Sequence, residues 1–455
     1  MAACIRSRAE PPSADMARIV LTTLGSLGDL HPFLAIAVEL KRRGHTPVIA
    51  THEIYRSRAE SAGLEFARVR PDFEQFGDVI EVMREAMDER RGSEVVLNRL
   101  VLPYLRETRD DLLAVARDAD LVVDHVLTFT APLVCEALGL PRVSTTLQPV
   151  AMFSTYDPPL FPGAPWMSAL RGFGPPLWRA FWNFGRLATR GWFRELDVMR
   201  REMALPPMRE HPLLDGFSRD LHLVLFSREL MAPQPDWPAA AVQPGFPIHD
   251  RGEHGDGLSA ALARWLEAGD ASGDPPLVFT LGSSAVFTAG TFYDAAAAAA
   301  RTLGRRAVLL TGLDGLNPVS GVPLVEDAPL DARLVAVPYA PHSELMPRGG
   351  AVIHQGGVGT TAQAMRSGRP MLVVPFSHDQ PDNAQRCARL GIARVLPRKR
   401  VSAGAFVREL SALLADANTA AQAKLVAERM RHEPGAAGAV DAIEALLAKR
   451  ARQQP

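Results

Sequence analysis

Residues 351–383 read AVIHQGGVGTTAQAMRSGRPMLVVPFSHDQPDN, and this stretch decides the fold. Its first apolar run is predicted to be a β-strand that ends in His354. Three glycines that allow a tight turn and close approach to the backbone come next: Gly356, Gly357 and Gly359. A helix is predicted from Thr360 to about Ser367. Unpaired N–H groups and the positive end of the helix dipole meet at a helix start, so this turn is predicted to bind an anion such as a phosphate.

A second strand is predicted at residues 371–374, and a polar loop follows it. Three side chains of this loop can hydrogen-bond to hydroxyl groups: Asp379, Gln380 and Asn383. Ligands of open α/β sheets bind at the carboxyl ends of the strands. Phosphate donors on one loop and hydroxyl-binding groups on the next therefore predict a nucleotide-sugar site. The alternatives are a glycine turn that only joins a strand to a helix, and a surface carboxylate at Asp379.

Apolar strands alternate with helices through both halves of the chain, which predicts two α/β units whose parallel sheets are covered on both faces. Strands are predicted at residues 18–24, 46–51, 64–68, 121–124 and 142–145, and then at 277–281, 306–310, 334–337, 351–353, 371–374 and 393–396. Helices are predicted at residues 33–43, 104–117, 131–138 and 291–303, and from about residue 402.

Length and composition describe a globular protein with two domains. The chain has 455 residues, 47% hydrophobic and 22% charged, and its net charge of −1 gives no general attraction for nucleic acid. Three cysteines lie far apart without metal-ligand spacing, which is typical of a reducing, cytoplasmic setting. No apolar run approaches the roughly 18 residues of a membrane helix, and residues 1–15 resemble a disordered tail more than a secretory signal.

The run His354-x-Gly-Gly-x-Gly-Thr360, followed by His378-Asp379-Gln380-x-x-Asn383, resembles the donor-site signature of inverting GT-B nucleotide-sugar glycosyltransferases of the UDP-glycosyltransferase type. The similarity is greatest to the bacterial branch that includes macrolide, sterol-type and rhamnolipid-forming enzymes. It runs from Met16 onward and includes three weaker motifs: Gly25-Ser26-Leu27-Gly28-Asp29, Pro244-Gly245-Phe246-Pro247 and Val278-Phe279-Thr280-Leu281-Gly282-Ser283.

This resemblance implies an α/β GT-B fold, in which two Rossmann-like domains face each other across a cleft. The expected parts are a tail at 1–15, an acceptor-binding domain at 16–242, a linker at 243–257, a donor-binding domain at 258–438 and a C-terminal helix at 439–455 that packs back on the first domain. The donor would be a UDP- or dTDP-sugar, used as a co-substrate without any cofactor.

The family pattern also implies the donor-site residues. They are Ser283, Tyr339, Pro341, His342, His354, Gly356, Gly357, Val358, Gly359, Thr360, Asp379, Gln380 and Asn383. Backbone N–H groups at the helix start and the His354 imidazole would stabilise the leaving diphosphate, so no metal ion is expected. For Ser283, a simple helix N-cap is an equal alternative.

The general base is expected in Gly28-Asp29-Leu30-His31-Pro32, where similar plant enzymes carry histidine at the position of Asp29. Asp29 is the first candidate and His31 the second; the alternative for Asp29 is a helix N-cap. Asp124 matches the acid that orients the plant histidine. With aspartate at position 29, Asp124 or the neighbouring His125 would instead adjust Asp29.

Residues 166–209 break the alternation and hold four of the six tryptophans. Helical spacing places Trp178, Phe181 and Trp182 on one face. One interpretation buries these aromatics beneath an insertion on the first domain. The other makes them an acceptor wall or an arginine-flanked contact with a membrane surface. Acceptor specificity varies in this region of the family, which favours a lipophilic acceptor.

The main hypothesis is an inverting, cytoplasmic glycosyltransferase that moves a hexose or deoxyhexose to a lipophilic hydroxyl. This hypothesis leaves open whether the protein is free in the cytoplasm or in peripheral contact with the inner membrane face. The alternatives are a catalytically silent nucleotide-sugar-binding subunit and an epimerase on the same fold. A dinucleotide oxidoreductase is disfavoured because no G-x-G-x-x-G follows the first strand.

Overall fold

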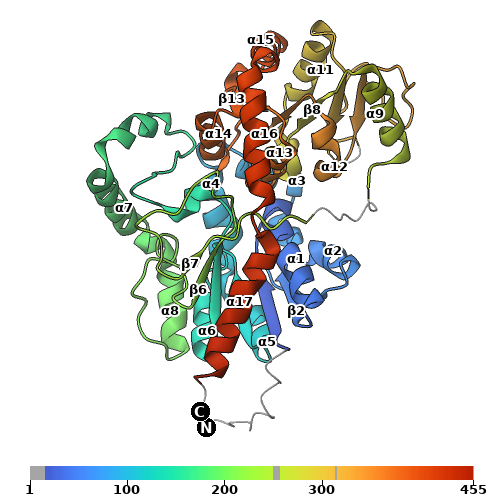
Figure 1. Cartoon of the computed structure of the whole chain (residues 1–455). Helices are drawn as coiled ribbons and strands as arrows, with labels where there is room; N and C mark the ends of the chain where they lie inside the picture. Colours follow the sequence, from blue (N-terminus) through green and yellow to red (C-terminus); the bar gives the residue numbers. More distant parts are fainter. Residues whose placement is uncertain (1–15, 250–256, 313–314, 454–455) are drawn as a thin grey trace.

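The computed structural model describes residues 16–249, 257–312 and 315–453. The predicted tail at 1–15 and residues 250–256 of the predicted linker lie outside the described residues. Figure 1 shows two α/β domains, one above the other, with the end of the chain returning to the first. Among the described residues, no helix is both long and apolar enough to cross a bilayer.

The first domain contains a parallel sheet with the strand order β3-β2-β1-β4-β5-β6-β7. Its strands are β1 (Arg18–Thr22), β2 (Thr46–Thr51), β3 (Glu65–Arg68), β4 (Leu121–Asp124), β5 (Arg142–Thr146), β6 (Leu221–Val224) and β7 (Ala241–Val242). Val20 of β1 pairs with Val48 on one side and Val122 on the other, so β1 is central. The five predicted strands are present. Strands β6 and β7 were not predicted, because one is four residues long with His222 inside it and the other has two residues.

The second domain repeats the scheme with the parallel order β10-β9-β8-β11-β12-β13. Its strands are β8 (Leu277–Thr280), β9 (Ala307–Leu310), β10 (Leu334–Val337), β11 (Ala351–His354), β12 (Met371–Val373) and β13 (Ala393–Val395). Every predicted strand of this half is present, and β8 and β11 form the centre of the sheet.

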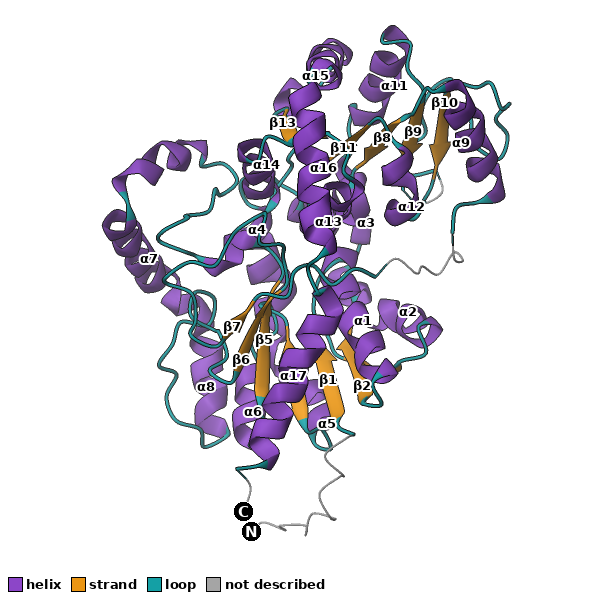
Figure 2. Cartoon of the chain, in the orientation of Figure 1, coloured by secondary structure: helices purple, strands orange, loops and turns teal. Residues whose placement is uncertain are grey.

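Helices cover both sheets (Figure 2). The α-helices are α1 (Leu27–Arg42), α2 (Arg56–Ser61), α3 (Val79–Ala86), α4 (Gly92–Val95), α5 (Leu105–Ala116), α6 (Ala131–Leu138), α7 (Pro175–Thr189), α8 (Arg194–Glu202), α9 (Ala260–Ser272), α10 (Gly282–Ala285), α11 (Phe292–Thr302), α12 (His342–Leu345), α13 (Val358–Ser367), α14 (Gln380–Arg389), α15 (Ala403–Ala415), α16 (Ala417–Arg431) and α17 (Gly435–Ala451). Short helical turns include η5 (Pro149–Met152), η6 (Pro165–Phe173) and η7 (Arg190–Phe193).

Helix α1 begins at Leu27, six residues before the predicted start at Phe33. Ser26 is its N-cap and forms a capping box with Asp29, which makes the earlier start favourable. Pro32 therefore lies inside the helix and does not mark its beginning. As a result, Asp29 belongs to the first turn of a helix that follows the central strand β1.

Helix α17 packs against the first domain, although it follows the second in sequence (Figure 1). Arg43, the C-cap of α1, donates to Asp441 at 2.6 Å and to Glu444 at 2.9 Å. Ile443 is fully buried in the same apolar cluster as Leu40. The chain thus crosses between the domains at least twice, and α17 becomes part of the first domain's core.

Candidate active site

The glycine turn after β11 has the backbone geometry that only glycine adopts easily. Gly356 has a φ of +91°, and a Cβ atom there would lie 2.9 Å from Val373 Cγ1 and 3.0 Å from the Gln380 carbonyl oxygen. Gly357 is the N-cap of α13, which begins at Val358, two residues before the predicted start. The first N–H groups of α13 therefore lie directly after the turn, where an anion can bind.

His354 closes β11 and is fully buried. Its Nδ1 accepts a hydrogen bond of 3.1 Å from the Gly356 N–H, so the proton of the neutral ring is on Nε2. Burial, with the nearby His342, lowers the pKa of His354 to about 3, which keeps the ring neutral. Nε2 has no hydrogen-bond partner within the described ranges. The ring therefore offers an unpaired N–H donor beside the start of α13.

Asp379 is bound to the start of α13. Its Oδ2 accepts from the Val358 N–H at 3.1 Å and from Asn383 Nδ2 at 2.7 Å. Asn383 is buried and also donates to the Gly356 carbonyl at 2.9 Å, so it holds the turn and the carboxylate together. Burial, with the Asp29 charge nearby, raises the pKa of Asp379 to about 7.

Gln380 begins α14, whereas the sequence predicted a polar loop through Asn383. Its side-chain oxygen accepts from the Phe376 N–H at 2.8 Å and the Ser377 N–H at 3.2 Å. The amide NH2 group is therefore the part of Gln380 that can meet a ligand. The adjacent His378 has a φ of +55° and contacts Ser93 of α4 in the first domain, at 3.1 Å between Nδ1 and Oγ.

Ser283 lies within α10, on the turn after β8, and the N-cap of that short helix is Leu281. The preceding Gly282 approaches the start of α13 closely. A Cβ atom there would lie 2.3 Å from Gln355 Nε2 and 3.2 Å from Thr360 Oγ1. Gln355 is buried, and its side-chain oxygen has no partner in the part of the chain that the structure describes. Sequence reasoning missed Gln355, because it stands at the unspecified position that follows His354 in the motif.

Helices α1 and α13 come from different domains and contact each other where the domains join (Figure 2). A Cβ atom at Gly359 would lie 3.7 Å from the Cα of Gly28. Val358 is buried in the apolar cluster that contains Leu30 and Phe33 of the first domain. The structure thus brings the start of the donor helix to the helix that carries Asp29.

The two oxygens of Asp29 have different neighbours. Oδ2 accepts from the Ser26 N–H at 2.8 Å and from Ser26 Oγ at 3.2 Å, which completes the capping box. Oδ1 lies 3.5 Å from Nε2 of His125, and the side chain is 23% exposed. A Cβ atom at Gly25 would lie 2.3 Å from Oδ2, so a glycine there is needed to admit the carboxylate.

His125 faces Asp29, whereas Asp124 does not. The Asp124 carboxylate is buried and accepts from Arg142 Nε at 2.7 Å. Both ring nitrogens of His125 lack a hydrogen-bond partner among the described residues, and burial lowers its pKa. Side chains alternate along a strand, so the two neighbours point to opposite sides. His125 is therefore the residue that contacts Asp29, whereas Asp124 forms an ion pair with Arg142.

His31, the second candidate base, lies nearer the predicted nucleobase loop. Its ring centroid is 6.1 Å from that of His249, and burial, with His249, Arg58 and His342 nearby, lowers the pKa of His31 to about 3. Burial also lowers the pKa of His342 to about 4. Pro341 is the N-cap of α12, and Tyr339 is 41% exposed just before it.

The three predicted acceptor-binding aromatics lie on α7. Trp178 and Trp182 are buried in one cluster with Met167, whereas Phe181 is 36% exposed. The two tryptophans are thus core residues of the segment that carries α7. Contact of these aromatics with an acceptor remains a prediction.

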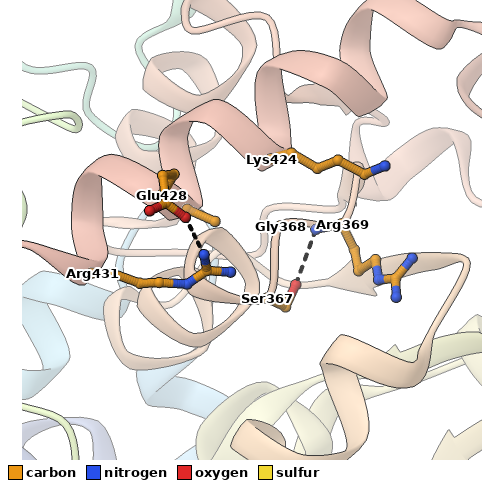
Figure 3. Close-up of a pocket in the computed structure, with 7 residues that line it drawn as sticks. Ser367, Gly368, Arg369, Lys424, Glu428 and Arg431 are labelled. Carbon is orange, nitrogen blue, oxygen red and sulfur yellow. Dashed lines mark hydrogen bonds and ion pairs between the residues drawn. The ribbon is translucent and has the colours of Figure 1, made fainter.

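A hollow of about 430 Å³ lies near the opposite end of α13 (Figure 3). It is lined by Ser367, Gly368, Arg369, Lys424, Ala427, Glu428 and Arg431. Figure 3 shows the Arg431 side chain directed at Glu428 and the Arg369 N–H bonded to Ser367. A ten-residue helix is about 15 Å long, so this hollow is remote from the glycine turn.

One Asp-x-Asp sequence is present, Asp118-Ala119-Asp120. Asp120 Oδ2 accepts from the Arg18 N–H at 2.8 Å, at the amino end of β1 and therefore opposite the candidate site. Across the described ranges, no group of three or more His, Cys, Asp or Glu side chains is arranged to hold a metal ion.

Two family descriptions match the chain. Residues 19–149 match the glycosyltransferase family 28 N-terminal domain, and residues 318–446 match the erythromycin biosynthesis protein CIII-like, C-terminal domain. An O-mycaminosyltylonolide 6-deoxyallosyltransferase of Streptomyces fradiae is 33% identical over 94% of this chain and 97% of that protein. The sterol 3-beta-glucosyltransferase UGT80A2 of Arabidopsis thaliana is 26% identical over 94% of this chain and 65% of that protein.

Solved structures share the fold. The glycotransferase of kitacinnamycin superposes with a TM-score of 0.70 at 20% identity, covering 95% of this chain and 99% of that one. The spinosyn rhamnosyltransferase SpnG complexed with thymidine diphosphate gives a TM-score of 0.64 at 20% identity, covering 94% of this chain and all of that one. Two Rossmann-like domains with parallel sheets are the architecture of the GT-B class. The chain belongs to the UDP-glycosyltransferase family of this class and is a glycosyltransferase, as the donor motif predicted.

Proposed function

We propose that the chain is an inverting glycosyltransferase that moves a hexose or deoxyhexose from a dTDP- or UDP-sugar to a hydroxyl of a lipophilic small molecule or lipid. The relatives named as a deoxyallosyltransferase and a sterol glucosyltransferase support the sugar and acceptor classes. The similar structures solved with thymidine diphosphate support the donor. In this proposal residues 16–242 bind the acceptor and residues 258–438 bind the donor.

The observation that carries this proposal is the unpaired Nε2–H of His354 beside the first turn of α13. When the bond between the anomeric carbon and the phosphate oxygen breaks, negative charge develops on the leaving nucleoside diphosphate. A neutral N–H donor and the N–H groups of a helix start stabilise such charge more in the transition state than in the bound donor. Gly282 lies close to the start of α13, so the neighbouring Ser283 would also contact the diphosphate.

We propose that Asp29 is the general base that removes the proton of the acceptor hydroxyl. As the acceptor oxygen attacks the anomeric carbon, its proton passes to the carboxylate. Oδ2 is occupied by the capping box, so Oδ1 is the oxygen for this step. His125, 3.5 Å away, acts as a positioning residue: its neutral ring can donate to Oδ1 and hold it. In similar plant enzymes a histidine is the base and an acid orients it. Here the proposed base is the acid, Asp29, and the histidine, His125, orients it.

Asp379 and Gln380 would bind the sugar hydroxyls. Asp379 Oδ1 and the Gln380 amide NH2 are the polar groups of these two side chains that no hydrogen bond within the described structure occupies. Phe181 is the exposed member of the α7 aromatics and would contact an apolar acceptor.

The direct test is to incubate the purified full chain with a panel of dTDP- and UDP-sugars and hydrophobic alcohols, and to identify the products by mass and anomeric configuration. A product with the opposite anomeric configuration to the donor supports the proposal. Isomerised nucleotide sugar without transfer would indicate an epimerase, and donor binding without turnover over the whole panel would indicate a silent subunit.

A second test concerns metal. We expect transferase activity to survive exhaustive dialysis against EDTA, because the diphosphate charge is met by N–H donors at the start of α13. Loss of activity that manganese or magnesium restores would reject this account of the leaving group.

A further inference from the structure

Helix α7 has an outward face without charged side chains. Leu177, Phe181, Phe184 and Leu187, here called the α7 outer face, recur at helical spacing and are 40%, 36%, 69% and 78% exposed. The opposite side of the helix is anchored, because Trp178 and Trp182 are buried against Met167. Figure 1 shows α7 at the edge of the molecule, away from both sheets. A stable helix therefore presents an apolar stripe to the surroundings.

The segments on either side of α7 extend this exposed apolar surface. Trp166 and Phe173 of η6 are 57% and 69% exposed, and Trp192 of η7 is 40% exposed. Of the eighteen exposed large apolar side chains in the described chain, seven lie within residues 166–192. Isolated exposed apolar residues are ordinary, but a concentration of this kind marks an interaction surface.

The charge of this segment identifies the partner. Residues 158–194 contain no Asp or Glu and five arginines, in a chain whose net charge is −1. Arg171 and Arg186 pair with Asp157 and Asp215, and Arg190 donates to the Met208 carbonyl. Arg179 and Arg194 are exposed and have no ion-pair partner in the described part of the chain. The segment therefore combines exposed aromatic and aliphatic side chains with an excess of positive charge.

We propose that the α7 outer face docks on the surface of an anionic lipid bilayer. A helix of this kind lies in the interface with its apolar face among the headgroups and acyl boundary, and arginines around it attract anionic lipids. Tryptophan side chains favour the same depth of the membrane. The surface belongs to the domain that we propose to bind the acceptor, but docking does not depend on the identity of donor or acceptor.

The test is co-sedimentation of the full chain with sucrose-loaded vesicles of phosphatidylcholine alone or with 30% phosphatidylglycerol added. We expect the protein to bind the anionic vesicles, and we expect this binding to weaken as the salt concentration rises, because salt reduces the range of the electrostatic attraction. The double substitution Phe184→Gln with Leu187→Gln should lower the partition coefficient by at least about tenfold, since each side chain contributes apolar burial. The double substitution Arg179→Gln with Arg194→Gln should remove most of the preference for anionic vesicles.

A matched control uses exposed apolar residues elsewhere, Val38→Gln with Leu425→Gln, which should bind vesicles like the wild type. The melting temperature and transferase activity on a water-soluble acceptor should be unchanged in the Phe184/Leu187 variant, which shows that it is folded. Wild-type protein that stays in the supernatant with both vesicle types would overturn the proposal. A second result would also overturn it: a wild-type protein that binds no lipid and forms a dimer, which the double substitution Phe184→Gln with Leu187→Gln converts to a monomer. In that case a second copy of the chain covers the α7 outer face.

Discussion

Replacing Asp29 with asparagine separates its two possible roles, because the structure divides them between its two oxygens. Oδ2 completes the capping box of α1 through Ser26, and Oδ1 faces His125 and the domain junction. Asparagine has nearly the same size and keeps an oxygen that can accept from the Ser26 N–H. It cannot take up a proton from an acceptor hydroxyl near neutral pH.

The two roles predict effects of different size. Loss of a general base lowers turnover by about 100-fold to 10,000-fold, which corresponds to about 2.7–5.5 kcal/mol of transition-state free energy. Loss of the negative charge in the first turn of a helix costs about 0.3–1 kcal/mol of folding free energy. A domain of this size would lose only a few degrees of melting temperature for that cost. The Asp29→Asn protein should therefore be folded and nearly inactive.

The assay is kcat at saturating donor, with dTDP or UDP affinity measured by calorimetry and the melting temperature measured in parallel. Ser26→Ala is the matched control, because it removes the capping hydroxyl and leaves the carboxylate, so most turnover should remain. His125→Ala should reduce turnover in the wild type but cause no further loss in the Asp29→Asn background, since His125 is proposed to act through Asp29. An Asp29→Asn enzyme that keeps more than a tenth of wild-type turnover would refute the assignment. If His31→Ala is inactive in that case, the base is His31.

Four other substitutions test the donor side and its attachment to the first domain. His354→Ala should reduce turnover about 100-fold or more by removing the Nε2–H donor, and Gly357→Val should reduce it further by blocking the backbone at the turn; wild-type turnover in a folded His354→Ala protein would reject this role. Arg386→Met leaves the buried Asp382 carboxylate without its 2.7 Å partner, so urea unfolding should show a loss of about 3–5 kcal/mol, and a change below 1 kcal/mol would mean that the ion pair contributes little. Folding raises the pKa of Asp379 from 3.8 to about 7, so between these pH values the folded protein keeps a proton that the unfolded chain has lost. The resulting contribution to the free energy of unfolding is complete below about pH 4 and is lost as the pH rises through 7. Asp379→Asn should therefore flatten the decline of stability between pH 5 and pH 7.5, and an unchanged slope would contradict the raised pKa.

Local chemistry explains why the donor half could be predicted from the sequence. The strand that ends in His354, the glycine turn and the helix end near Ser367 each depend on residues a few positions apart. The residue after that helix end, Gly368, has the left-handed geometry of a C-cap. The alternation of apolar strands with helices similarly predicts both parallel sheets. The local errors concern where helices begin. Helix α1 begins before its predicted start at Phe33 because Ser26 and Asp29 cap it there. Helix α13 begins two residues early, and α14 begins at Gln380 within the predicted loop.

Contacts between distant segments could not be predicted in the same way. Asp124 and His125 are neighbours in sequence, and which of them faces Asp29 depends on the register of β4 beside β1. Asp157, in the segment between η5 and η6, pairs with Arg386 of α14. The two residues are 229 positions apart, so no local pattern indicates this contact. Such contacts depend on how two domains meet, which is a property of the packed chain.

The starts of α1 and α13 lie close together, and their surroundings explain how the candidate site can be stable without a ligand and still bind an anion. Each positive helix end is satisfied by a carboxylate of its own domain: Asp29 in the first turn of α1, and Asp379 at the Val358 N–H of α13. A nucleoside diphosphate at the start of α13 adds negative charge beside Asp379. Because the pKa of Asp379 is already raised to about 7, protonation of this carboxylate costs little near neutral pH, and the protonated form can remain next to the diphosphate without repulsion. Asp29 is held by its hydrogen bonds to Ser26 on the other side of the junction, so we expect the position of this proposed base to stay the same when the donor binds.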